Sequence, residues 1–236
     1  AGKVPRKHFP YLTKTLKHLA EAGPRDFYEG RLASTLVEDI SRCGGILSRE
    51  DLEKYQANLV EPLVRDYRNT RLHVHPELNS GSTLLKALSL LKQPLETEKA
   101  ASAEAFLAIA GALDQVYRER LETMGDVPGG RDMSCTTHLC VIDSQGSMVS
   151  LTQTLLSIFG SKLVLPQTGI LMNNGLMWFN PEPGHPNSLA PDKHCLANTC
   201  PVIGLNDSGG MALGASGGRR IMPAVLQLLY LLIDGE

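Results

Sequence analysis

The sequence predicts an α+β fold in which a helical first half is followed by strand hairpins and a last buried helix. Three observations support this class. Apolar residues recur at helical spacing in successive segments before residue 123. Two later segments, 138–155 and 200–216, have strand-like apolar runs on both sides of a Gly-containing turn, which is the pattern of β-hairpins. The chain then ends on a strongly apolar run, 221–233, so helices are expected to pack on a sheet.

Helical periodicity and capping signals define the elements of the first half. Gly23 ends the first predicted helix, and Ser48 with Asp51 gives the third one a start like a capping box. A single strand is predicted over 64–75, ended by Pro76. The predicted helices are 11–23, 27–45, 48–55, 79–92 and 103–122.

Glycine, proline and polar residues divide the second half. Residues 122–135 are Gly-rich and polar, which predicts a mobile linker. The turns DSQGS and NDSGG join the strands of the hairpins 138–155 and 200–216. A short strand over 169–174 and a Pro-rich loop over 181–194 lie between these hairpins, and a glycine turn leads into the last helix.

Composition and charge exclude several classes of function. The chain has 236 residues, 42% of them hydrophobic and 20% charged, which is ordinary for a soluble globular protein. A net charge of −2 offers no basic surface for nucleic acid or for an anionic membrane. The run 221–233 is too short to span a membrane, and residues 1–30 do not have the pattern expected of a signal peptide. Because the chain lacks an initial methionine and stops directly after a helix, we expect an excerpt of a longer protein.

The cysteines favour free thiols over a metal site. Their number is odd, and no pair has CxxC spacing. His194 next to Cys195, with Cys200 nearby, is the one combination that suggests metal ligands. Free thiols in a reducing compartment are the simpler interpretation, so we expect no metal and a cytoplasmic location. The five cysteines are Cys43, Cys135, Cys140, Cys195 and Cys200.

The stretch SCTTHLCVID, residues 134–143, places two threonines where the linker meets a predicted strand. A threonine hydroxyl is a weak nucleophile without a base, and an N-terminal threonine carries a base in its own α-amine. That amine has an ordinary pKa of about 8, close enough to operating pH to accept a proton. A flexible segment that can be cut before Thr136, and a strand that holds the new terminus, would allow this chemistry. Threonine is also common at the start of a strand, so this stretch alone leaves both interpretations open.

A second stretch, GASGGRR at 214–220, matches the needs of the same chemistry. Two successive glycines at the mouth of a helix present backbone N–H groups with no side chain in the way, as an oxyanion hole requires. A plain tight turn is the alternative interpretation.

Several blocks in order resemble the γ-glutamyltranspeptidase family of N-terminal-nucleophile hydrolases. The segment FYEGRLASTLVEDISRCGGILSREDLEKY looks like helices of that family's large subunit, and PELNSGSTLLKALSLL like its Ser-Gly turn and helix. TTHLCVID is similar to the start of its small subunit. FGSKLVLPQTGILMNN, NPEPGHPNSLAP and GASGGRRIMPAVLQ then follow in the family's order, so the resemblance covers nearly the whole chain.

The resemblance implies a four-layer αββα sandwich, present here in part, and autocatalytic cleavage of a zymogen between Cys135 and Thr136. Residues 1–135 would then be the end of the large (α) subunit and 136–236 the start of the small (β) subunit of a heterodimer, and a dimer of heterodimers stays open. Thr136 is implied as nucleophile and Thr154 as its supporting hydroxyl. Gly217 and Gly218 match the oxyanion-hole glycines. No metal or organic cofactor is needed, and a periplasmic or secreted location stays open because many relatives are exported.

Three polar contacts of the transpeptidases to a glutamyl head group are replaced here. Where the family has two aspartates after Asn174, this chain has Met177 and Trp178. Its serine pair stands here as Ala197 and Asn198, and its asparagine after the supporting threonine as Leu156. A charge-assisted hydrogen bond contributes about 1.5–3 kcal/mol to the binding free energy, so its loss disfavours a γ-glutamyl substrate.

The predicted function is therefore a self-processing amidohydrolase that cleaves a small-molecule amide through an acyl-threonine intermediate. The substitutions resemble the amidohydrolase branch, which includes cephalosporin-type acylases and oxamate amidohydrolase. Trp178 is the candidate wall of the acyl pocket, with Asn198 and Asn174 as further substrate-binding candidates. Two alternatives remain: a true γ-glutamyltransferase or glutathione hydrolase, and a cleavage-dead homologue that acts as a binding or scaffold protein.

Overall fold

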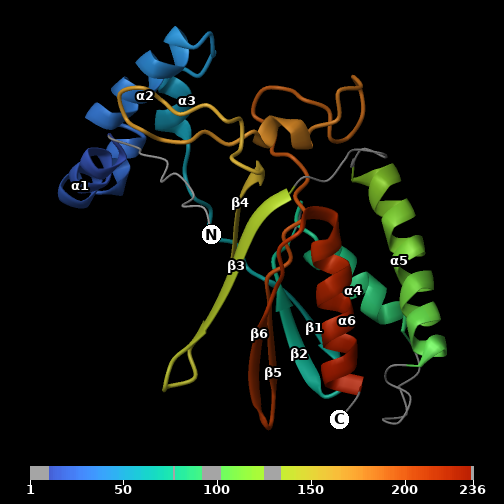
Figure 1. Cartoon of the computed structure of the whole chain (residues 1–236). Coiled ribbons are helices and arrows are strands. Elements are labelled where there is room, and N and C mark those ends of the chain that lie inside the picture. The colour runs from blue at the N-terminus through green and yellow to red at the C-terminus, as the bar shows by residue number, and fades with distance from the viewer. Residues whose placement is uncertain (1–10, 77, 92–101, 125–133, 235–236) are drawn as a thin grey trace, which may run out of the picture. The chain divides into compact units, whose positions relative to one another are not determined.

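The computed structural model describes residues 11–76, 78–91, 102–124 and 134–234. The chain divides into two compact units (Figure 1). The first unit contains residues 1–59 and 159–173, and the second contains residues 60–158 and 174–236. All candidate site residues belong to the second unit.

The first unit is helical. Its elements are α1 (Leu12–Ala22), the 3-10 turn η1 (Pro24–Phe27), α2 (Arg31–Arg42) and α3 (Arg49–Lys54). The apolar stripe predicted for 27–45 is confirmed, because Leu32, Leu36 and Ile40 of α2 are buried. Leu16 of α1 instead remains 57% exposed. The capping box of α3 is also confirmed, since Ser48 and Asp51 satisfy each other's backbone N–H groups.

The strand predicted over 169–174 is wrong. Leu171 forms only an isolated bridge with Val164. The backbone groups of this segment pair within a tight loop: the Leu165 N–H donates to the Ile170 carbonyl at 2.8 Å, and the Met172 N–H donates to the Leu163 carbonyl at 2.9 Å. Side chains of α1 and α2 hold the residues just before the segment, since Thr15 donates to the carbonyl of Thr168 at 2.7 Å and Asp39 accepts from the N–H of Gln167 at 2.9 Å.

The second unit is built on an antiparallel sheet in the order β1-β2-β5-β6. Its strands are β1 (Leu63–Tyr67), β2 (Thr70–Val74), β5 (Val202–Asn206) and β6 (Gly209–Leu213). The hairpin predicted over 200–216 is confirmed as β5–β6.

The single strand predicted over 64–75 is wrong, because β1 and β2 form a hairpin that turns at Arg68 and Asn69. Arg68 adopts a φ of 54°, in the left-handed region. Its Nε donates to Oδ1 of Asp234 at 2.7 Å, and an Nη donates to the carbonyl of Leu91 at 3.0 Å. These distant partners hold a turn that local sequence does not indicate.

Three helices pack on one side of this sheet (Figure 1): α4 (Gly81–Leu90), α5 (Ala103–Thr123) and α6 (Ile221–Asp234). All three were predicted. They form one core with the inward side chains of the strands. Leu72 of β2, Leu84 of α4 and Leu226 of α6 are fully buried in this core. A mixed helix and antiparallel-sheet architecture agrees with the predicted α+β class. No helix within the described residues is long and apolar enough to cross a membrane.

A long two-stranded ribbon carries the candidate nucleophile. β3 (Ser134–Ile142) pairs with β4 (Met148–Ser157), as the hairpin prediction required. Most of the predicted linker, 125–133, lies outside the described residues, whereas its first two residues belong to α5 and its last two to β3. The ribbon contacts β6 and the 3-10 turn η4 (Gly218–Arg220).

Candidate active site

The β3–β4 pairing sets Thr136 opposite Thr154. The two residues are direct cross-strand partners, just after an irregularity in the register between Ser134 and Thr136. Their Oγ1 atoms are hydrogen-bonded at 3.3 Å, and both side chains are half-buried. The ribbon therefore places a second hydroxyl within reach of the predicted nucleophile, as cross-strand neighbours in an antiparallel pair require.

The end of β4 bends sharply beside this pair. Leu156 has a φ of 74°, a conformation that non-glycine residues rarely adopt. The bend points the Leu156 N–H at Oγ1 of Thr154, 2.9 Å away. Oγ1 of Thr154 therefore accepts two hydrogen bonds, one from this N–H and one from the Thr136 hydroxyl, and a hydroxyl oxygen has two lone pairs for them. Backbone strain of this kind is often found at functional sites.

The predicted oxyanion turn lies against the same strand. Gly217 and Gly218 have φ values of 123° and 58°, and Gly218 opens η4, which contacts β3. The Arg220 N–H closes the turn on the Gly217 carbonyl at 3.1 Å. Tyr117 of α5 donates from its hydroxyl to the Arg219 carbonyl at 2.8 Å. Two glycines with positive φ thus form a fixed turn at the mouth of α6, where backbone N–H groups lack intrahelical partners.

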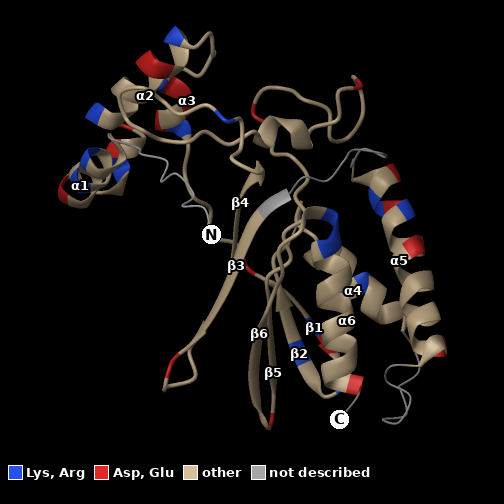
Figure 2. Ribbon diagram, viewed as in Figure 1, with Lys and Arg blue, Asp and Glu red and all other residues tan. Residues whose placement is uncertain are grey.

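The surroundings of the nucleophile strand carry little charge. Between Ser134 and Ser157 the only charged residue is Asp143, at the far turn of the ribbon, so the ribbon is almost entirely uncharged (Figure 2). Two basic residues, Arg219 and Arg220, lie instead in η4, directly before α6 (Figure 2). Burial lowers the pKa of His138, which favours its neutral form beside this site.

Asn174, a predicted substrate-binding residue, is engaged in clamping the end of β4. Its Oδ1 accepts from the Ser157 N–H at 3.0 Å, and its Nδ2 donates to Oγ of Ser157 at 2.8 Å. Its own N–H donates to the carbonyl of Leu155 at 3.2 Å. The structure thus gives Asn174 a positioning contact beside Leu156.

Met177 and Trp178 lie together in the 3-10 turn η3 (Gly175–Trp178). Met177 is 71% exposed, and Trp178 is half-buried. A residue that the sequence did not single out, Asn187, connects this turn to the Asn198 loop. The buried amide of Asn187 donates to the Trp178 carbonyl at 2.6 Å and accepts from the Leu196 N–H at 2.9 Å.

Asn198 lies, half-buried, in a loop held on both sides. The Ala197 N–H donates to the carbonyl of Leu78 at 2.8 Å, and the Ser80 N–H donates to the carbonyl of Thr199 at 3.0 Å. Arg120 of α5, which is 2% exposed, donates to the Ala197 carbonyl at 2.8 Å. An internal arginine so placed is a positioning residue that sequence reasoning missed, because its partners are distant along the chain.

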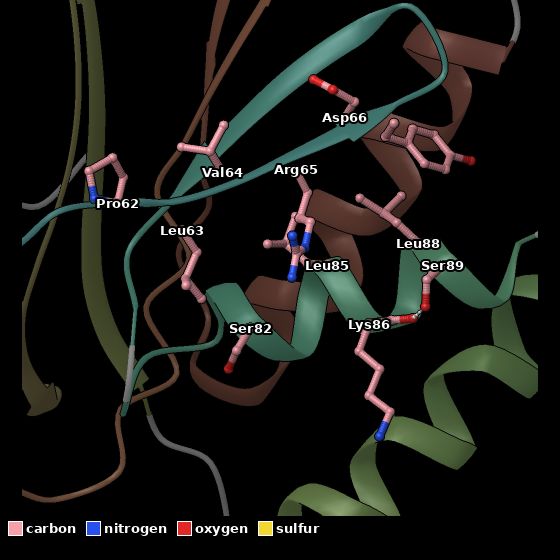
Figure 3. Close-up of a pocket in the computed structure, with 11 residues that line it drawn as sticks. Pro62, Leu63, Val64, Arg65, Asp66, Ser82, Leu85, Lys86, Leu88 and Ser89 are labelled. Atoms are coloured by element: carbon pink, nitrogen blue, oxygen red, sulfur yellow. Dashed lines mark hydrogen bonds between the residues drawn. The ribbon is translucent and has the colours of Figure 1, made fainter.

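A separate hollow of about 540 Å³ lies between β1 and α4 (Figure 3). It runs along the edge of the sheet, with Leu63 and Val64 on one side and Leu85 of α4 on the other. None of the predicted site residues lines it. Its position marks the open outer edge of β1.

The described residues hold no group of three or more His, Cys, Asp or Glu side chains able to bind a metal ion. Cys43, Cys140, Cys195 and Cys200 are free thiols. The predicted cleavage bond lies between Cys135 and Thr136, both within β3.

Comparisons with known proteins identify the family of the chain. The family model "Gamma-glutamyltranspeptidase" matches residues 6–130 and 128–235. The glutathione hydrolase proenzyme of Escherichia coli (strain K12) is 28% identical over 274 residues, which cover 94% of this chain and 47% of that protein. The acylase ACY 1 proenzyme of Pseudomonas sp. (strain V22) is 30% identical over 257 residues, covering 93% of this chain and 46% of that protein.

A solved structure is similar over the same extent. The cephalosporin acylase from Bacillus halodurans superimposes with a TM-score of 0.78 at 25% identity, covering 95% of this chain and 47% of that one. The chain spans about half the length of the curated relatives it matches. With a family model that covers almost all of its residues, the chain belongs to the γ-glutamyltranspeptidase family.

Proposed function

We propose that the full-length protein is a self-processing amidohydrolase whose nucleophile is Thr136. The observation that carries this proposal is the hydrogen-bonded pair of Thr136 and Thr154 on a ribbon that contacts η4, the turn that begins at Gly218. The family supports it, because the glutathione hydrolase and acylase relatives are both named as proenzymes.

The first step in this proposal is cleavage of the chain itself. The Thr136 hydroxyl attacks the carbonyl carbon of Cys135 and displaces the Thr136 nitrogen, so an ester replaces the amide. Water then hydrolyses the ester and leaves a carboxylate on Cys135 and a free α-amine on Thr136. The products are two subunits, 1–135 and 136–236 with whatever precedes and follows them in the full-length protein.

The second step uses the new terminus on an external amide. The α-amine accepts the proton of the Thr136 hydroxyl as the oxygen attacks the substrate carbonyl. Backbone N–H groups of the Gly217–Gly218 turn would stabilise the oxyanion, a contribution of about 2.7–4 kcal/mol for one donor in other hydrolases. The amine then protonates the leaving nitrogen, and water releases the acyl group from the threonine.

The acyl group is proposed to be small and not γ-glutamyl. Leu156, Met177, Trp178 and Ala197 stand where the transpeptidases carry polar groups, and the nucleophile ribbon has no charge near Thr136. The basic residues nearest in sequence to the oxyanion turn are Arg219 and Arg220 of η4, which makes a small anionic amide such as oxamate a candidate. The second candidate, hydrolysis of γ-glutamyl compounds, rests on the 28% identity to a glutathione hydrolase.

The finer architecture is proposed as the family's four-layer αββα sandwich. The described sheet already has helices on one side and the β3–β4 ribbon against β6. That ribbon has an apolar, exposed surface formed by Leu139, Val141, Val149 and Leu151. Within the described residues, β1 is an edge strand of its sheet. Such surfaces are usually covered in a complete fold, in line with relatives about twice as long as this chain.

A substrate panel tests the proposal. The purified full-length protein is incubated with primary amides including oxamate, with N-acyl amino acids and with a γ-glutamyl anilide, and release of ammonia or amine is measured. We expect hydrolysis of a small acyl amide by the wild type and none by Thr136→Ala. Efficient turnover of the anilide would instead support the glutathione hydrolase alternative. A wild type that stays uncleaved and hydrolyses no amide would support the scaffold alternative.

A further inference from the structure

The ring of His138 packs against the backbone of Gly214, which an ordinary strand residue need not do. His138 follows Thr136 by two residues on β3, so both side chains project to the same face of the ribbon. Its ring lies directly on the backbone of Gly214. A Cβ added to Gly214 would lie 2.0 Å from Cε1 and 2.5 Å from Nδ1 of His138, so no side chain fits there while the ring keeps its place.

Both ring nitrogens of His138 have partners on the ribbon. Nδ1 lies 2.9 Å from Oγ1 of Thr152, its cross-strand neighbour, and Nε2 lies 3.1 Å from Sγ of Cys140. Two contacts on opposite edges of the ring fix its plane. The ring is therefore a rigid support attached to β3 and β4, and not a mobile surface group.

The backbone that rests on this ring leads directly into the oxyanion turn. On one side of it, Oγ of Ser150 donates to the Leu213 carbonyl at 2.7 Å. On the other side, Tyr117 holds the Arg219 carbonyl at 2.8 Å. Residues 214–218 between these anchors include three glycines, so the segment has unusual backbone freedom. The His138 ring supports this segment at its first residue, Gly214. The ring lies on the same face of the ribbon as the Thr136 side chain.

We propose that His138 is a positioning residue that sets the place of the Gly214–Gly218 turn relative to Thr136. This inference rests on the proposed function, because it assigns a task within the same site. His138 acts through packing on Gly214 and does not itself touch the substrate. Its removal would leave room for the turn to shift, and a displacement of about 1 Å at an active site can reduce the rate about 100-fold.

The test compares His138→Ala, Gly214→Ala and the double variant in the full-length protein. Amide hydrolysis is measured as kcat and KM, self-cleavage by intact mass, and folding by Tm. We expect each single variant to lower kcat about 10- to 100-fold while KM changes little, because a misplaced oxyanion turn affects the transition state. In the double variant the new methyl occupies space that the ring has left, so kcat should be no lower than in either single variant.

Controls separate positioning from a general loss of structure. Gly111→Ala adds a methyl where nothing lies within 4 Å, and His194→Ala removes an exposed imidazole; both should leave kcat unchanged. His138→Phe keeps a ring on Gly214 without the bonds to Thr152 and Cys140, and should retain more kcat than His138→Ala. If His138→Ala does not fold, the comparison of His138→Phe with Gly214→Ala decides, and equal loss in these two contradicts the proposal.

Three results would overturn the assignment to His138. One is a kcat in both single variants within about twofold of the wild type. Another is a double variant in which the two losses simply multiply. The third is a loss of kcat that the two controls reproduce. If instead the wild type is neither cleaved nor active, the proposed function fails first, so the two failures are distinguishable.

Discussion

Replacement of Thr154 by valine removes one hydroxyl and almost nothing else. In the structure that hydroxyl is hydrogen-bonded to Oγ1 of Thr136 at 3.3 Å and accepts from the Leu156 N–H at 2.9 Å. Valine has nearly the same shape, so no cavity is created. The variant therefore tests what this hydroxyl contributes to the nucleophile and to the bend at the end of β4.

The two contacts predict different magnitudes. Loss of one neutral hydrogen bond to the nucleophile, about 0.5–1.5 kcal/mol, corresponds to a rate about two- to thirteenfold lower. A half-buried Leu156 N–H without its acceptor should lower the free energy of unfolding by about 1–3 kcal/mol. Self-cleavage, followed by intact mass over time, and amide hydrolysis should both slow, because the same hydroxyl serves both reactions.

Thr154→Ser is the matched control, because it keeps the hydroxyl and loses only a methyl group. It should stay within about twofold of the wild-type rate, since both hydrogen bonds can form. The reasoning is refuted if the valine variant reacts at the wild-type rate, or if serine loses as much activity as valine.

Three further predictions concern the supports of the site. Leu156→Ile should lower the free energy of unfolding by about 1–2 kcal/mol, because a β-branched residue is strained at a φ of 74°. Leu156→Gly should be nearly neutral, and urea unfolding measures the stability of both variants. Asn187→Ala should destabilise the protein by about 1–3 kcal/mol by leaving the Leu196 N–H without its acceptor, seen as a lower urea midpoint with an unchanged slope. Timed alkylation with mass detection should modify the exposed Cys140 early and Cys200 last, because burial raises the pKa of Cys200 to about 12; early loss of Cys200 would contradict its burial.

Local patterns in the sequence were sufficient to predict much of the fold. The capping box at Ser48, the hairpin turns DSQGS and NDSGG, and the glycine turn before the last helix all depend on neighbouring residues, and the structure contains each of them. Thr154 was expected to support Thr136 only because of the family resemblance, and the register of β3 and β4 sets the two residues opposite each other.

Features that depend on distant partners were not predictable. The turn at Arg68 is held by Asp234, which is 166 residues away in sequence. The segment 169–174 belongs to a tight loop and not to a strand, and Asp39 and Thr15 of distant helices hold the residues just before it. Likewise, no local pattern indicated that Arg120 would hold the loop that carries Asn198, or Asn187 the turn that carries Trp178, although a buried polar residue requires partners.

The central claim is that the mature protein is cut at one bond and works through the threonine exposed there. The direct measurement is the intact mass of the full-length protein and of its Thr136→Ala variant, with the N-terminal residue of the smaller product identified. The account predicts two chains for the wild type, the second beginning at Thr136, and one uncut chain for the variant. A wild type that hydrolyses amides while continuous through Cys135 and Thr136 would contradict it.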